Sequence, residues 1–89
     1  MSDPVRTVTN ILESREQNNR MVDGIKVVSS CHVGCCNIEL SKNGNIVSVS
    51  VLDFDDGEHY YDVDTGKNVP GYYGKDVYIA AVTILRTLG

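Results

Sequence analysis

The sequence predicts an α+β domain with an N-terminal helix, a three- or four-stranded antiparallel meander sheet and a C-terminal helix, both helices packed on one face of the sheet. Apolar residues recur at helical spacing near both ends of the chain and alternate at strand spacing between them. Asp-Gly and Asn-Gly pairs, which favour tight turns, separate the strand segments. The 89 residues suit a single domain, residues 1–89.

The first helix is predicted from about Pro4 to between Ser14 and Gln17. Asp3 can cap it, and Pro4 suits the first helical position, where the missing N–H costs no hydrogen bond. A frayed N-terminal arm is the alternative, because valine and threonine are mediocre helix formers. The polar segment 16–20 is expected to be a loop. The apolar residues that share one face of the helix are Val5, Val8, Ile11 and Leu12.

Strand alternation starts at Ile25, after an expected Asp-Gly turn. The apolar positions are odd-numbered before Gly34 and even-numbered after it. A shift of one residue moves every side chain to the other face of a strand, so Gly34 should mark a bulge or a turn. The segment Ile25–Leu40 is therefore either one bent strand or two short strands that meet near His32–Gly34.

Two more strands follow. Asn43-Gly44 favours the positive φ angles of a type I′ hairpin turn. The strand after it, Ile46–Phe54, has apolar groups on both faces, so we expect it to be central and at least partly covered on both sides. After a turn at 55–57, the alternation from Glu58 to Val63 places three residues on each face: His59, Tyr61 and Val63 on one, and Glu58, Tyr60 and Asp62 on the other.

The C-terminal part of the chain should be a loop followed by a helix. The segment 68–74 contains Pro70-Gly71 and is expected to be the loop. The segment Lys75–Leu88 has the apolar stripe of a well-buried helix, although its many β-branched residues leave a strand as the alternative. Its length favours the helix. The stripe consists of Val77, Ala81, Ile84, Leu85 and Leu88.

Composition restricts the partners and the location. The formal net charge is -4, whereas binding to nucleic acid requires a basic face, so we expect no direct nucleic-acid binding. A basic protein is easier to accommodate. No apolar run approaches the ~20 residues that cross a bilayer, and the N-terminus lacks the features of a signal peptide. We therefore expect a cytoplasmic protein without membrane contact, and reduced thiols for its three cysteines.

The segment 51–67 is the most acidic part of the chain, and no Lys or Arg lies between Lys42 and Lys67. Carboxylates two residues apart on a strand can imitate a line of phosphates, which a nucleic-acid-binding protein would meet with complementary charge. Tyrosine is enriched at interfaces. The alternative is a solvated edge whose charges prevent aggregation. The predicted partner-binding residues are Asp53, Asp55, Asp56, Glu58, Tyr60, Tyr61, Asp62 and Asp64.

These observations predict a small acidic interaction protein that binds and blocks a basic, nucleic-acid-handling protein surface. It would be an inhibitor or regulator, like phage anti-defence or nuclease-immunity proteins in size and charge. We expect no enzyme and no cofactor, because no phosphate loop, nucleophile elbow or metalloprotease helix is present.

Two alternatives belong to other classes. The first is a metal- or ligand-binding domain, because thiolates and imidazole are the usual zinc ligands. However, adjacent cysteines in a strand point to opposite faces, so small core residues are the favoured interpretation. The second alternative is a structural homodimer that pairs through the apolar C-terminal helix. The zinc-type ligands are Cys31, His32, Cys35 and Cys36, with His59 as a further member.

Overall fold

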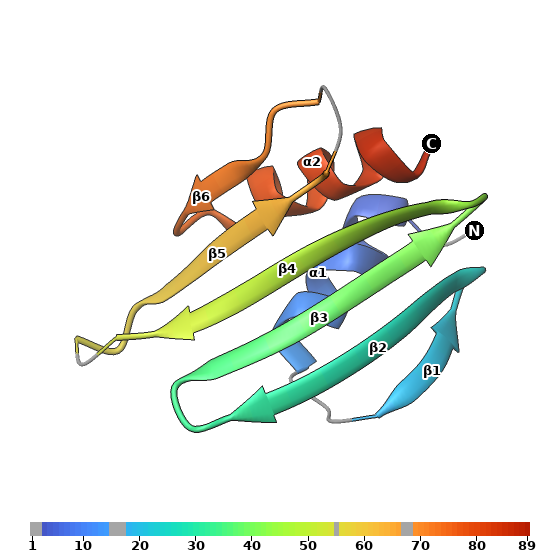
Figure 1. The fold of residues 1–89 in the computed structure, drawn as a ribbon. Helices are drawn as coiled ribbons and strands as arrows, with labels where there is room; N and C mark the ends of the chain where they lie inside the picture. The colour runs from blue at the N-terminus through green and yellow to red at the C-terminus, as the bar shows by residue number, and fades with distance from the viewer. Residues whose placement is uncertain (1–2, 15–17, 55, 67–68) are drawn as a thin grey trace.

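The computed structural model describes residues 3–14, 18–54, 56–66 and 69–89. Two helices, α1 (Pro4–Ser14) and α2 (Val77–Leu88), lie side by side on one face of a six-stranded antiparallel sheet (Figure 1). We call this the inner face; no described element covers the opposite, outer face. The predicted α+β class and the terminal helices are confirmed. No helix in the described part of the chain has the length and apolar character needed to cross a membrane.

The order of the strands in the sheet is their order in the chain, so the sheet is a meander. The prediction of three or four strands is too low: the segment Ile25–Leu40 forms two strands, which gives four, and a short strand is added at each edge. The strands are β1 (Asn19–Val22), β2 (Ile25–His32), β3 (Cys35–Lys42), β4 (Asn45–Asp53), β5 (His59–Asp64) and β6 (Tyr72–Gly74).

Strand β1 begins at Asn19, within the segment 16–20 that the sequence predicts to be a polar loop. Arg20 lies opposite Val27 of β2 and so belongs to the inner face. Its guanidinium donates hydrogen bonds to Ser29 Oγ (3.2 Å) and to Ser14 Oγ at the end of α1 (3.1 Å). Contacts with the end of α1 and with β2 therefore satisfy the hydrogen-bonding groups of a charged side chain on the inner face of the sheet.

Strand β6 also replaces a predicted loop. Gly71 passes so close to the backbone carbonyl of Val63 in β5 that a Cβ atom there would clash with it. The Tyr72 hydroxyl accepts a hydrogen bond from the backbone N–H of Asp76 (3.0 Å), which joins β6 to the start of α2. The glycine that indicates a loop here permits two backbones to approach closely.

The turns follow the predictions. Asn43 and Gly44 have φ angles of 55° and 77°, the positive values of the type I′ turn. Asp23 and Gly24, with φ angles of 49° and 82°, form the expected turn between β1 and β2. Gly34, with φ 83°, lies in the turn between β2 and β3. The alternative of one bent strand is thereby excluded.

The core lies between the inner face and the two helices. Strand β4 lies inside the sheet, as expected, but no described element covers its outer face, where Ile46 is 53% exposed. An antiparallel sheet with helices on one side only buries alternate residues of each strand. The central strands contribute Val27, Ile38, Leu40, Val47, Val49 and Val51, and the helices Val8, Leu12, Ile84 and Leu88.

Both helices begin at aspartate caps. Asp3 Oδ1 accepts a hydrogen bond from the Val5 N–H (3.0 Å), as predicted. Asp76 Oδ1 accepts from the N–H groups of Tyr78 (2.9 Å) and Ile79 (3.3 Å) at the start of α2. Helix α2 is less completely buried than predicted, since Tyr78 and Ile79 are exposed. These two side chains are the ones that a homodimer through α2 would bury.

Candidate functional site

The outer face carries charge of one sign over most of its area. Residues paired across neighbouring strands share a face, and Ser48 of β4 lies opposite both Glu39 of β3 and Asp64 of β5. Asp62 lies one row further along β5, opposite Ser50. Glu39, Asp62 and Asp64 are exposed, and they are all the charged residues that β3 to β6 place on the outer face. In the described residues, Lys26 of β2 is the only cation on this face.

Three aromatic side chains form a cluster beside these carboxylates. Tyr60 of β5 contacts Phe54 edge to face, with ring centroids 4.7 Å apart, and stacks on Tyr73 of β6 at 5.7 Å. Tyr73 lies opposite Asp62 and is 58% exposed, and Phe54 is 44% exposed. The cluster presents apolar rings to the solvent next to negative charge, the combination found at protein interfaces.

A groove of about 340 Å³ lies on the outer face of the central strands. Three serine residues, Ser30, Ser48 and Ser50, line it together with Asn37 and Glu39. Ser50 Oγ donates a hydrogen bond to Asn37 Oδ1 (3.0 Å), and the Glu39 carboxylate provides the only charge in the groove. The groove can therefore accept a polar side chain that carries positive charge.

The connection between β4 and β5 adds exposed carboxylates at one end of the sheet. Asp56 Oδ1 accepts a hydrogen bond from the Glu58 N–H (2.9 Å), so this carboxylate also shapes the turn. The Phe54 N–H donates to the Glu58 carbonyl (3.1 Å), which closes the connection. Asp55, also predicted to bind the partner, lies outside the described residues.

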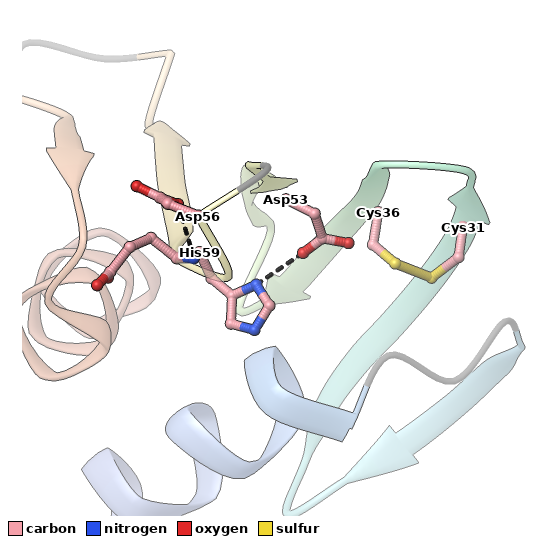
Figure 2. Close-up of polar contacts among 6 residues, drawn as sticks. Cys31, Cys36, Asp53, Asp56 and His59 are labelled. Atoms are coloured by element: carbon pink, nitrogen blue, oxygen red, sulfur yellow. Dashed lines mark hydrogen bonds and ion pairs between the residues drawn. A yellow bond between two sulfur atoms is a disulfide. The ribbon is translucent and has the colours of Figure 1, made fainter.

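Two of the predicted partner-binding residues belong to the inner face. Asp53 lies opposite His59, and Asp53 Oδ1 is 2.7 Å from His59 Nδ1 (Figure 2). Tyr61 is 6% exposed and belongs to the core, so its side chain is not accessible to a partner.

The structure therefore brings together Tyr60, Asp62 and Asp64 on the outer face, with Asp56 and Glu58 at its end. Sequence reasoning did not include Glu39, Phe54 and Tyr73 in the site. The signal for Glu39 was present, because it alternates with Ile38 and Leu40, which belong to the core. Tyr73 could not be placed without β6.

The cysteine and histidine cluster divides between the two faces. Cys31 and Cys36 lie opposite each other on the inner face and form a disulfide, so the expectation of reduced thiols is wrong for this pair. Cys35 and His32 lie opposite each other on the outer face, as expected for adjacent cysteines in a strand. Among the described residues, no three His, Cys, Asp or Glu side chains are grouped to hold a metal ion.

No protein-family model, no curated protein and no solved structure matches the chain. Function is therefore inferred from the outer face alone.

Proposed function

We propose that this protein is a small acidic interaction protein, an inhibitor or regulator whose outer face binds and blocks a basic protein surface that handles nucleic acid. One observation carries the proposal: the outer face of β3 to β6 combines carboxylates as its only charges with an exposed aromatic cluster. Phage anti-defence and nuclease-immunity proteins are the classes that it would resemble in action.

The spacing of the carboxylates suits a partner that binds phosphate. Glu39 and Asp64 lie in one row, two strands apart, which corresponds to about 10 Å at a strand spacing of about 4.8 Å. Asp62 and Asp64 lie two residues apart on β5, or about 7 Å. Lysine and arginine side chains that span neighbouring phosphates of a nucleic acid can meet charges at such distances.

The aromatic cluster and the groove supply contacts that charge alone does not. Tyr73 and Phe54 can bury apolar area against a partner, since exposed aromatic rings often carry most of the binding energy of an interface. The groove can accept the head of one arginine or lysine beside Glu39.

The outer face is large enough for a specific interface. The central strands have eight or nine residues. With four and three residues in the edge strands, the six strands present a flat face of about 600 Å² at about 3.4 Å per residue and about 4.8 Å per strand, the lower end of the area that each partner buries in a standard interface. Binding with the outer face therefore requires no change in the fold.

Capture from a lysate of the producing cell tests the proposal with two matched double variants. Asp62→Asn/Asp64→Asn removes two carboxylates from the outer face. Glu13→Gln/Asp23→Asn removes two from the helix side; Asp23 accepts a hydrogen bond from Thr7 Oγ1 (2.9 Å), which asparagine can also accept. Both variants change the net charge equally. We expect the wild type and the helix-side variant to capture a basic nucleic-acid-binding protein. The outer-face variant should not capture it.

Competition then tests the mode of binding. Duplex DNA should displace the captured protein, because both ligands would occupy the same basic surface, and elution should need less salt as carboxylates are removed. If all three proteins capture the same set, or none captures anything, the outer face is a solvated surface. If the captured protein stays bound in the presence of excess DNA, the mimicry of phosphate is wrong.

A further inference from the structure

The Cys31–Cys36 disulfide lies on the inner face at the margin of the core, where Cys36 belongs to the core cluster and Cys31 packs against it. The next pair along the inner face, Asp53 and His59, has side chains that are 35% and 49% exposed. Figure 2 shows the disulfide at the end of the β2–β3 hairpin, with the Asp53–His59 pair at the same end of the sheet. Cys36 is 5% exposed, whereas Cys31 is only partly buried. Cys31 is therefore the more accessible of the two cysteines to a reagent in solution.

The strand pairing, rather than the bond, holds the two cysteines together. They are direct partners in the β2–β3 register, and their Cα atoms are 4.0 Å apart. The pair nearest the turn is His32 and Cys35. These two residues flank a two-residue turn, so they exchange the backbone hydrogen bonds that close the hairpin, and Cys31 and Cys36 are the next pair along it. Cys31 and Cys36 therefore form a pair without mutual backbone hydrogen bonds, in which the side chains lie closest. The two thiols would remain adjacent after reduction.

The bond also constrains little of the unfolded chain. The two cysteines are separated by five positions in the sequence. The entropic contribution of a disulfide grows with the length of the loop that it closes, so a bridge across one hairpin contributes less than a bridge between distant segments. The hairpin itself is also held by β4, which pairs with the whole of β3. Breaking the bond should leave the fold intact.

We propose that Cys31 and Cys36 are a reversible redox site that exchanges with an external dithiol while the protein stays folded. One thiolate of the dithiol attacks the Cys31 sulfur, and Cys36 leaves as a thiolate that takes up a proton. The second thiol of the reagent attacks its own sulfur in the mixed disulfide and releases Cys31. The protein gains two electrons and two protons, and the reagent becomes a disulfide.

The third cysteine provides the control. Cys35 lies on the outer face, where its Sγ is 3.9 Å from Asn37 Oδ1, and it is the one cysteine without a disulfide. Since Cys35 and Cys36 point to opposite faces of β3, Cys35 takes no part in the exchange. The Cys35→Ser variant should therefore be reduced and reoxidised at the rate of the wild type.

The experiment treats the full oxidised chain with dithiothreitol in native buffer, alkylates free thiols at intervals and locates the label by peptide mass spectrometry. Amide NMR spectra of the same samples report the fold. We expect Cys31 and Cys36 to become labelled together while the spectrum stays dispersed, and oxidised glutathione to restore the same bond. Reduced glutathione, as a monothiol probe, should add to Cys31 rather than to Cys36.

A series in urea separates this site from a structural disulfide. Exchange in the folded state should proceed at a rate that low urea barely changes, whereas a bond that opens only on unfolding would be reduced faster with every increment of urea. Reduction limited to unfolding conditions, loss of the dispersed spectrum on reduction, or failure of the Cys31→Ser/Cys36→Ser variant to fold would each overturn the proposal. No partner is needed, so the outcome is independent of the proposed function.

Discussion

The inner and outer faces of the sheet are built from the same strands but differ in burial and in chemistry. On β3, Ile38 and Leu40 are at most 2% exposed, whereas Glu39 between them is exposed. On β4, Val47 and Val49 alternate in the same way with Ser48. The inner face stabilises the fold by burying apolar area against α1 and α2, whereas substitutions on the outer face cost the fold little. The outer face can therefore vary in chemistry with little effect on stability.

The largest effect should come from a cavity on the inner face. Leu40→Ala removes a side chain that is 0% exposed, and we expect it to lower the free energy of unfolding by roughly 2–5 kcal/mol. Ser48→Ala, on the outer face of the adjacent strand, should change it by less than about 0.5 kcal/mol. Urea unfolding measures both. Equal losses in the two variants would mean that the outer face is also packed against something.

Two tyrosines of nearly equal exposure allow binding by the outer face to be compared with binding by the helix layer. Tyr73 is 58% exposed on the outer face, and Tyr78 is 60% exposed on α2. Tyr73→Ala should weaken binding of the captured partner by roughly 1–2 kcal/mol, the range of an interface anchor. Tyr78→Ala should leave the affinity unchanged in calorimetric titration. The reverse result would place the binding surface on the helices.

The cap of α2 should have an intermediate effect on stability. Asp76→Ala removes the acceptor for the Tyr78 and Ile79 N–H groups, and such a loss costs about 1 kcal/mol. Asp76→Asn retains an acceptor and should unfold close to the wild type. If alanine and asparagine behave alike, the side-chain cap contributes nothing, and α2 is held by its buried face.

The double variant of the outer face should lose binding completely but should show the smallest change in stability. Asp62→Asn/Asp64→Asn should change the free energy of unfolding by no more than about 0.5 kcal/mol, because both residues are exposed. Thermal melting of the purified variant measures this change. A loss of several kcal/mol would show that the carboxylates serve the fold, and lost capture could then not be assigned to recognition.

Part of the site could be predicted from the sequence, and part could not. Alternation along β5 correctly placed Tyr60 and Asp62 on one face and Tyr61 and Val63 on the other. The clustering of acidic residues in the sequence did not show that Asp53 belongs to the inner face, where it pairs with His59. A short acidic segment looks like one surface, but a strand divides its residues between two faces.

The sequence by itself determined the α+β class, the two helices, the Asp3 cap and the turn at Asn43-Gly44, because these depend on local periodicity, on side chains that bond to nearby backbone and on positive φ angles. At Gly34 it left a bulge or a turn open, and the structure has the turn. Only the tertiary structure decided β1 and β6. Their pairing depends on contacts with neighbouring segments, such as Arg20 with Ser14 and Ser29 and Gly71 with Val63, which the pattern within each short segment does not show. It also decided which face the helices cover, and hence which side of each strand is left for a partner.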